Sequence, residues 1–516
     1  MVSKKTLNIE KQVSSVTVEK IDELKNVPIC TKVRAVFSKM TVEPILVCYL
    51  LSNVLASFTS HNLTLEKACR VNLGFDKDTC DALSVRNQSH PGFRTSEESV
   101  QGLAANMAIW KNMFQGIVSS FVLLFLGSWS DKHKKRKPLI LNPILGDIAT
   151  YNGLIVSIMF FYELPLEFNI LVESIPYILT GGIFSMYAGV HTYVSGVSSQ
   201  ESRTNRFGSI QIATTMSVTA GLALWGILYH MIGFYGVFST CLAILFFGYV
   251  YGLFFVKEID ELGMKEKEVA EEKRGKKKSF LLDFCDIKHV ADTFKIAFRK
   301  REGNMRSRIC WLLVLSTVLS GPITGENNVT YYYVRYKFGW DTEQSSMFLT
   351  FRYITQTLGI IFFMSFFDKY SKVNDTVVGM VACGSKIVAA FFYSFSPTPL
   401  YLYLGALIEV MSAATSITMK SILSKSVTTD ELGKIHSLSG LADASIPLLY
   451  GPLYSKIYAA TISFFPGAFY MTSAVLTIPA VLIYVWLYME FRKDEKEEQS
   501  RVQEVKLLSL HESDKT

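Results

Sequence analysis

Charged side chains inside long apolar runs are the residues of this sequence that could do chemistry. Arg352, Lys386 and Lys420 each stand in an apolar segment of the second half of the chain. A Lys or Arg at the centre of a membrane helix costs ~2.5–3.5 kcal/mol on insertion scales, so such residues face a cavity or a charged partner. Three cations in neighbouring segments predict a binding site for a small organic anion.

The same cations have acidic neighbours that could neutralise them. Arg352 and Lys386 could form fixed pairs with Glu326, Glu409 or Asp443, and the sequence leaves this structural alternative open.

Lys420 is the expected counter-charge for the anion, and Glu409 is expected beside it. The two residues are eleven positions apart, which is about three turns of an uninterrupted α-helix and returns to the same face. We therefore expect Glu409 and Lys420 to line one wall of a cavity. The alternative is that Lys420 lies near a helix end and extends its amine to water.

Polar residues in the first half predict the rest of the lining. Lys111, Asn112 and Gln115 form a polar stripe on one segment, and Asp147 and Glu173 supply acids in the two following segments. One Lys–Asp pair would fit there, and Glu173 could instead lie near water at the end of its segment. Gln211 is a further substrate-binding candidate.

Two acids are candidates for proton coupling. Asp147 and Glu326 lie in apolar segments, and a carboxyl group in an apolar cavity can load and unload a proton. His191 and His230 titrate in a suitable range, but their positions near segment ends favour a structural role.

Length and composition indicate a membrane protein. The chain has 516 residues, of which 49% are hydrophobic and only 19% charged, and apolar runs of about 20 residues recur along it. The expected spans cover residues 42–62, 104–127, 138–160, 170–195, 207–231, 234–256, 309–334, 345–367, 376–396, 399–424, 435–459 and 466–490. The sequence thus predicts an all-α chain with twelve transmembrane helices.

These spans divide the chain into five parts. We expect an N-terminal tail over 1–41, a six-helix bundle over 42–256, a basic linker over 257–308, a second six-helix bundle over 309–490 and a C-terminal tail over 491–516. Most of the 52 Lys and Arg residues fall in the tails, the linker and alternate loops, which places both termini in the cytosol. The net charge of +7 therefore requires no nucleic-acid partner.

The segment 61–103 is the largest loop on the opposite side. Cys69 and Cys80 lie in it and form the one plausible disulfide, with two free thiols as the alternative. Asn62 and Asn87 begin glycosylation sequons in the same loop.

The loop between the second and third spans carries the most specific motif. Gly127 and Asp131 are followed by a basic turn that includes Lys135 and Arg136. An acid at a helix end and a basic turn can form a charge latch between helix ends. The motif resembles the loop signature of the major facilitator superfamily, and a weaker copy begins at Phe367 and Asp368 in the second half. The resemblance implies two six-helix bundles that work by alternating access.

Further motifs narrow the resemblance to solute carrier family 46, the proton-coupled folate transporter family, and to its insect-like branch. They are Val42-Glu43-Pro44, Trp110 with Asn112, Gly127-x-Trp129-Ser130-Asp131, Val197-Ser198-Ser199 with Ser202-Arg203-Thr204, Gly325-Glu326, Val334-Arg335-Tyr336-x-Phe338-Gly339-Trp340, Leu423-Ser424-Lys425 and Ile478-Pro479-Ala480-Val481-Leu482-Ile483. The resemblance implies a proton symporter.

The functional positions of that family are only partly kept. Lys420 falls where the folate carrier has an Arg implicated in substrate and proton handling. Gly182, Gln211 and Gly321 replace three ionisable residues of the carrier, namely an Asp, a Glu and a His. Folate as substrate and proton coupling by the family's own residues are therefore in doubt, and muropeptides and nucleotide-like anions are alternatives that the resemblance suggests.

No familiar nucleotide-binding, metalloprotease or nucleophile motif occurs in the sequence. We therefore expect no enzyme, no cofactor and no metal, but a carrier in the lipid bilayer of the plasma or endolysosomal membrane, with a small anion and protons as its partners. The alternative function is that of a membrane receptor or scaffold that keeps the transporter fold but does not transport. Oligomeric state is not predicted.

Overall fold

The structure is a computed structural model that describes residues 41–85, 90–133, 135–198, 203–256, 304–340, 342–369, 374–428 and 431–513. The described residues contain helices and no strand. The first half comprises α3 (Glu43–Lys67), η1 (Ala68–Asn72), α4 (Lys77–Val85), α5 (Phe93–His133), α6 (Lys137–Met159), α7 (Leu166–Thr180), α8 (Gly182–Val197) and α9 (Arg203–Phe255). The second half comprises α12 (Met305–Phe338), α13 (Thr342–Lys369), α14 (Asp375–Ser394), α15 (Pro399–Ile408), η4 (Glu409–Met411), α16 (Ala414–Lys425), α17 (Leu432–Thr461) and α18 (Ala468–Ser513).

The predicted twelve crossings are confirmed by these helices. Ten helical segments among the described residues are long and apolar enough to cross a membrane. One of them, α9, contains two helices joined at Gly233, whose φ of 62° departs from helical geometry. The 30-residue α17 carries more polar side chains and is long enough for another crossing. Together these give twelve.

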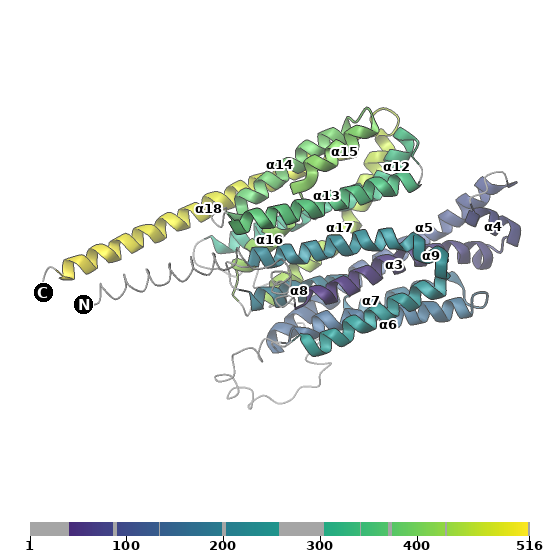
Figure 1. Cartoon of the computed structure of the whole chain (residues 1–516), viewed down its shortest axis with the longest axis horizontal. Coiled ribbons are helices and arrows are strands. Elements are labelled where there is room, and N and C mark those ends of the chain that lie inside the picture. The colour runs from purple at the N-terminus through teal and green to yellow at the C-terminus, as the bar shows by residue number, and fades with distance from the viewer. Residues whose placement is uncertain are drawn as a thin grey trace, which may run out of the picture.

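The helices form two groups that lie side by side, α3–α9 and α12–α18 (Figure 1). The first group packs around Tyr49, Tyr151 and Phe238, all buried. The second group packs around two clusters, one containing Tyr484 and the other Tyr393. Close packing of these large side chains stabilises each group through many van der Waals contacts, because lipid tails are as apolar as the side chains and provide no hydrophobic driving force.

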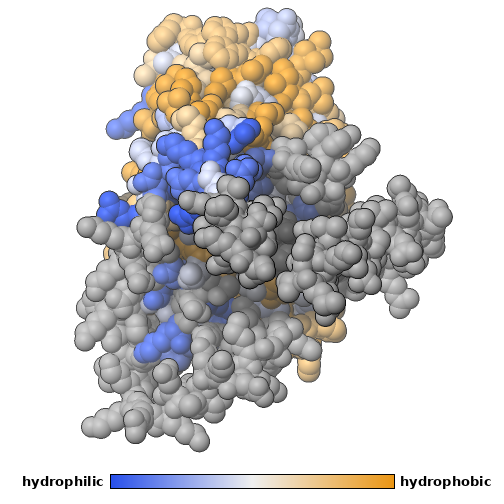
Figure 2. Space-filling model, turned by 90° about the vertical axis from the view of Figure 1, so that its left-hand side faces the viewer, coloured by the Kyte–Doolittle hydropathy of each residue, from blue (hydrophilic) through white to orange (hydrophobic). Residues whose placement is uncertain are grey.

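The two ends of the bundle differ. We call the end at which α3 begins and α5 finishes the tail end, and the end that carries α4 the loop end (Figure 1). Hydrophilic residues gather on the tail-end face beside an apolar flank (Figure 2). This is the pattern of a membrane protein viewed from the aqueous side.

Two predicted spans are broken helices rather than continuous ones. Gly181 and Gly182 have φ of 74° and 51° and separate α7 from α8, conformations that only glycine adopts without strain. A Cβ on Gly182 would lie 2.2 Å from the Tyr177 ring, so an acidic side chain does not fit here. The second break is the single 3₁₀ turn η4, which separates α15 from α16.

Candidate functional site

A cavity of about 230 Å³ lies between the two halves of the bundle. Its walls come from α8 in the first half and from α12, α16 and α17 in the second. The lining residues are Phe184, Tyr187, Ala188, His191, Ser320, Thr324, Lys420, His436, Gly440, Asp443, Ile446 and Pro447. An enclosed space between two bundles, with apolar walls and a few polar groups, is a common form of small-molecule site.

Lys420 supplies the cavity's permanent positive charge. Its Nζ donates to Asp443 Oδ2 at 3.0 Å and to Ser439 Oγ at 2.6 Å. The Lys420 side chain is 13% exposed and that of Asp443 is 27% exposed. Lys420 therefore faces the cavity among polar partners, which differs from the alternative of an amine extended to water at a helix end.

Two histidines meet in the cavity from opposite halves. The sequence analysis assigned His191 a structural role and did not name His436. His191 on α8 and His436 on α17 have ring centroids 5.7 Å apart. Ser195 Oγ lies 3.3 Å from His436 Nε2, across the boundary between the halves. A ring of Tyr187 stacks on His191. The available signal was the polar character of both positions in otherwise apolar helices.

Arg352, Lys386 and Glu409 lie outside the cavity. Together with Glu326 they form a group that we call the four-charge cluster. Arg352 binds Glu409 through Nε and Nη2, both at 2.8 Å, and Glu326 through Nη2 at 3.0 Å. Lys386 Nζ lies 2.7 Å from each glutamate, and Tyr393 donates to Glu409 at 2.8 Å. All four charged residues are buried, with two charges of each sign. The structure thus has the fixed pairs that the sequence left as an alternative.

The expectation that Glu409 shares a wall with Lys420 is wrong. It assumed a continuous α-helix, whereas η4 changes the helical register just after Glu409. Glu409 therefore faces the four-charge cluster, and Lys420 faces the central cavity.

The polar stripe of α5 has one buried partner. Lys111 Nζ binds Glu173 Oε2 at 2.7 Å, and Gln115 donates to the Glu173 backbone carbonyl at 3.0 Å. Ser60 also donates to Glu173. Lys111 thus pairs with Glu173, and the Lys–Asp pair that the sequence suggested is not formed. Asn112 is exposed.

The other acid, Asp147, is buried against α3 and accepts a hydrogen bond from Asn53 Nδ2 at 2.5 Å. No cation is in salt-bridge contact with Asp147 among the described residues. Gln211 on α9 accepts a hydrogen bond from Ser416 on α16 at 3.4 Å. That contact joins the two halves.

The loop motif forms a compact turn. Ser130 Oγ donates to the Lys135 carbonyl at 2.7 Å and accepts from Arg136 at 3.1 Å. Gly127 allows α5 to cross α17 closely, because a Cβ there would lie 1.8 Å from Ser437 Oγ. The side chain of Asp131 lies outside what the structure describes.

Contacts between the halves gather at the tail end, and we call them the tail-end seal. Arg203 on α9 donates to the Ser424 carbonyl at 2.7 Å, and Thr204 contacts Ser421 and Asp375. Lys425 binds the same Asp375 at 2.7 Å. The close approach of Gly127 to Ser437 completes the seal.

The exposure of side chains varies along α5. Trp110, Phe114 and Phe121 are 59%, 55% and 59% exposed. Leu123, Ser128 and Ser130, nearer the tail end, are buried. The tail-end part of α5 is therefore packed inside the bundle, beside the tail-end seal.

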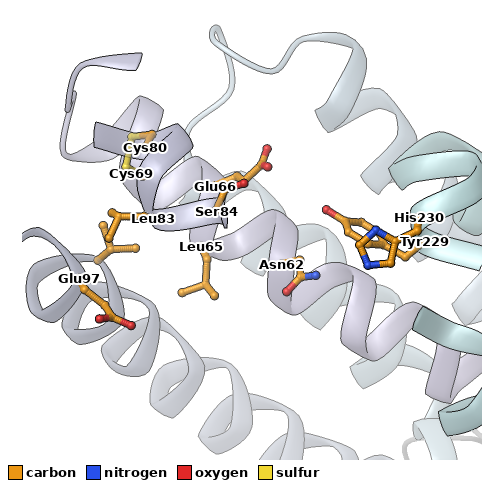
Figure 3. A pocket seen from close by; sticks show the side chains of 11 residues that line it. Asn62, Leu65, Glu66, Cys69, Cys80, Leu83, Ser84, Glu97, Tyr229 and His230 are labelled. Carbon is orange, nitrogen blue, oxygen red and sulfur yellow. A yellow bond between two sulfur atoms is a disulfide. The ribbon is translucent and has the colours of Figure 1, made fainter. Parts of the chain in front are cut away.

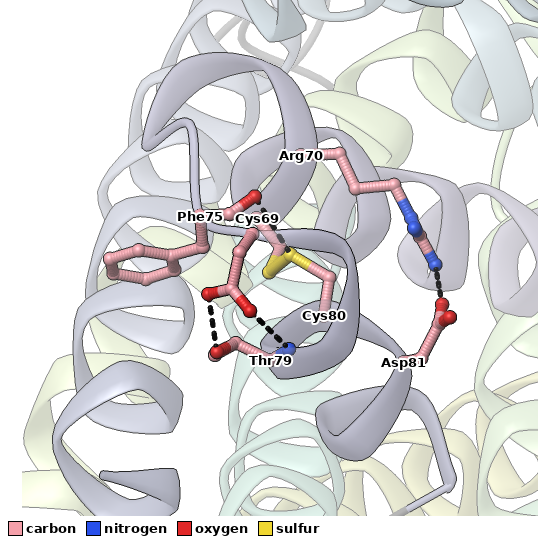
Figure 4. Close-up of a disulfide and its surroundings, with 7 residues drawn as sticks. Cys69, Arg70, Phe75, Thr79, Cys80 and Asp81 are labelled. Carbon is pink, nitrogen blue, oxygen red and sulfur yellow. Dashed lines mark hydrogen bonds and ion pairs between the residues drawn. A yellow bond between two sulfur atoms is a disulfide. The ribbon is translucent and has the colours of Figure 1, made fainter.

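At the loop end, Cys69 and Cys80 form the predicted disulfide, with Cα atoms 5.9 Å apart (Figure 4). Arg70 and Asp81 add an ion pair between the same two helices. Asp76 begins α4, where hydrogen bonds from the Thr79 hydroxyl and amide lower the pKa of its carboxyl. The carboxylate form of this cap therefore persists in mildly acidic surroundings.

A second cavity of about 630 Å³ adjoins the disulfide. Figure 3 shows Asn62 and Glu66 on one side and Tyr229 and His230 on the other. A glycan on Asn62 would start inside this cavity. Asn87, the other sequon, lies outside the described residues.

Breaking the disulfide is expected to loosen the loop end without altering the central cavity. Cys69→Ser and Cys80→Ser should each remove about 3 kcal/mol of loop-closure stabilisation, seen as faster hydrogen exchange over 73–85. The double variant should match either single one, and Cys48→Ser, which alters a free cysteine, should change nothing there. A double variant much less stable than both single variants would contradict the bond.

The fold is shared with solved structures of membrane transporters. The human organic anion transporter MFSD10 (TETRAN) matches with a TM-score of 0.60 and 16% identity, over 86% of this chain and 98% of that one. A bacterial homologue of the iron transporter ferroportin, in an outward-facing state, matches with a TM-score of 0.58 and 12% identity, over 86% and 99%. These similarities show that the chain has the fold of these multi-pass membrane proteins, with two helical bundles around a central cavity.

The chain belongs to the Major Facilitator Superfamily, whose family model matches residues 98–440 and 313–512. Its curated relatives include members of solute carrier family 46, as the sequence predicted. A probable peptidoglycan muropeptide transporter of Drosophila melanogaster is 22% identical over 84% of this chain and 83% of its own length. The proton-coupled folate transporter of Rattus norvegicus is 22% identical over 75% and 80%. A lysosomal proton-coupled steroid conjugate and bile acid symporter of Mus musculus is 23% identical over 72% and 76%.

Proposed function

We propose that this protein is a secondary active transporter that carries a small organic anion together with protons by alternating access. The central cavity carries the proposal, because it holds a lysine between two bundles that can rock against each other. Lys420 binds the anion, and Ser320 and Thr324 provide hydrogen-bond partners. Tyr187 and Phe184 offer aromatic faces to a planar or apolar part of the substrate.

The proposed transport cycle begins from the state described above. The basic loops favour a cytosolic tail end, and with that orientation the tail-end seal closes the cytosolic side. A cavity sealed on the cytosolic side fits an outward-facing state. The two bundles, over 42–256 and 309–490, would then move as units, and release of the seal would open the cavity to the cytosol. The turn containing Ser130, Asp131, Lys135 and Arg136 would act as the latch.

The substrate class follows from charge and from the relatives' names. One lysine suits a single carboxylate or phosphate, and the relatives suggest folate-like, muropeptide or bile-acid-like anions. A nucleotide-like anion also fits this chemistry. Proton coupling is supported by the two relatives named as proton-coupled, and a plasma or endolysosomal membrane suits the same chemistry.

The two predicted coupling carboxylates differ in their surroundings. Asp147 is bound by a neutral amide, so it can gain a proton without breaking an ion pair. Glu326 contacts two cations, and its protonation would leave excess positive charge in a buried cluster. Of the two, Asp147 can therefore be protonated at the lower cost.

Lys420→Ala is expected to weaken saturable anion uptake strongly. A charge-assisted hydrogen bond contributes about 1.5–3 kcal/mol, so apparent affinity should fall about 10- to 100-fold. The measurement is uptake of labelled reduced folate, a muropeptide and taurocholate by cells, at acidic and neutral external pH. Lys456→Ala removes an exposed lysine of α17 and should transport normally. Wild-type cells with confirmed surface expression that take up none of the three would favour a receptor or scaffold.

A further inference from the structure

Asp443 occupies a distinctive position in the central cavity. Among the described residues of the lining, it is the single carboxylate, and Lys420 is the single permanently charged cation. The two groups are in contact, with Lys420 Nζ 3.0 Å from Asp443 Oδ2. The second Asp443 oxygen, Oδ1, accepts a hydrogen bond from Ser316 at 2.8 Å. The carboxylate therefore fills the place beside Lys420 that an anionic substrate needs.

A carboxylate of the substrate and the carboxylate of Asp443 compete for one ammonium group. Charge-assisted contacts are stronger than neutral ones, so Lys420 binds whichever partner is ionised and within reach. When Asp443 gains a proton, its attraction for Lys420 weakens and the ammonium group becomes available. Ser439, which also accepts from Lys420, is neutral and holds the amine in place during the exchange.

We propose that Asp443 is the proton-binding group of this transporter, and that it couples one proton to one anion by exchanging places with the substrate on Lys420. In the empty state, the Asp443 carboxylate neutralises Lys420. A proton from the open side binds the Asp443 carboxylate, and the anion then binds the released ammonium group, so the loaded cavity keeps the charge of the empty one. On the other side, the proton leaves Asp443 and the restored carboxylate displaces the anion. This mechanism rests on the proposed function.

The other titratable groups around the pair are few. His191 and Tyr187 on α8 face the cavity, as does His436 on α17, and Tyr353 on α13 lies near Tyr187. Arg203 and Arg136 act on His436 from the tail-end side. Protonated histidines would attract an anion and so could also increase uptake in acid. The experiment must therefore separate their effect from that of Asp443.

Asp443 differs from the other buried acids in its exposure and its partner. Its side chain is 27% exposed, whereas those of Glu326 and Glu409 are 0% and 1% exposed. Asp147 is buried beside an amide of its own bundle. Only a carboxylate that is reached by water and bound to the substrate's own counter-charge links proton and anion binding directly.

The test compares Asp443→Asn with the wild type, using labelled folic acid, muramyl dipeptide and taurocholate as probes. Wild-type affinity should rise by at most about tenfold per unit of acidification, the limit for one linked proton. Asp443→Asn should bind at neutral pH as tightly as the wild type does in acid, and its affinity should not change with pH. It should still exchange external for preloaded probe, but a pH gradient should no longer drive accumulation. Asp78→Asn, which removes an exposed carboxylate of α4, is the matched control and should keep the wild-type pH profile.

The possible outcomes separate this inference from the proposed function. If a pH gradient still drives accumulation of the probe by Asp443→Asn, the inference is overturned and the proposed transport function is unaffected. A wild type that transports none of the three probes overturns the proposed function itself. If Asp443→Asn fails to reach the surface, Asp443→Glu keeps the acid and should retain coupling with a displaced pH profile. An Asp443→Glu profile identical to that of the wild type would then count against the inference.

Discussion

Arg352→Met is expected to leave most of the protein unfolded or retained inside the cell. Arg352 contributes one of the two positive charges of the four-charge cluster and binds Glu409 through two nitrogens. Its loss leaves two buried glutamates with Lys386 alone. Removing one partner of a buried pair costs about 3–5 kcal/mol, which is a large part of the stability of a typical protein. The measurement is the thermal unfolding temperature in detergent, together with the fraction at the cell surface.

A charge-balanced double variant provides the control for this prediction. Arg352→Met with Glu409→Gln removes one charge of each sign and keeps the 2.7 Å pair between Lys386 and Glu326. It should regain much of the lost stability, because no net charge remains buried. Arg492→Met, at an exposed cation of α18, should have little effect. A well-folded Arg352→Met protein that loses only anion uptake would instead make Arg352 a substrate-binding residue.

The span map was predictable because hydropathy is a local property of the chain. Each crossing needs about 20 apolar residues, and Gly233 lies between the fifth and sixth predicted spans, 207–231 and 234–256. Cys69 and Cys80 were predictable for a similar reason, since they lie in one loop with a sequence separation of 11. These features do not depend on how distant helices pack.

The cavity was harder to predict, because it depends on helix breaks and on contacts between the halves. The η4 turn sends Glu409 and Lys420 to different places, and no proline or glycine marks it. From the sequence, Arg352 and Lys386 were equally suited to bind a ligand or to pair with acidic residues. The packing of the helices determines which of the two occurs. His191 and His436 come together because α8 and α17 cross between the bundles, which periodicity along one helix does not reveal.

Gly127→Ala is expected to prevent closure of the tail-end seal. The added Cβ would lie 1.8 Å from Ser437 Oγ and 2.5 Å from Ser437 Cβ, so α5 and α17 could not approach as closely. Overpacking of this kind costs about 1–3 kcal/mol, which shifts a two-state equilibrium about 5- to 150-fold. The protein should therefore favour a state open at the tail end, with uptake reduced to a similar extent. Each bundle should remain folded.

Thiol labelling and a compensating substitution test this mechanism. Ala188→Cys places a thiol in the central cavity. This thiol should react faster with an impermeant reagent added from the tail side when Gly127→Ala is also present. Adding Ser437→Gly removes both clashing atoms and leaves only the Gly433 carbonyl at 3.4 Å, so labelling and uptake should return toward wild-type values. Gly102→Ala alters the same helix where nothing lies within 4 Å and should be silent. If Ser437→Gly fails to restore a folded Gly127→Ala protein, the seal does not act through this contact, and Gly127 is needed for the fold of α5 instead.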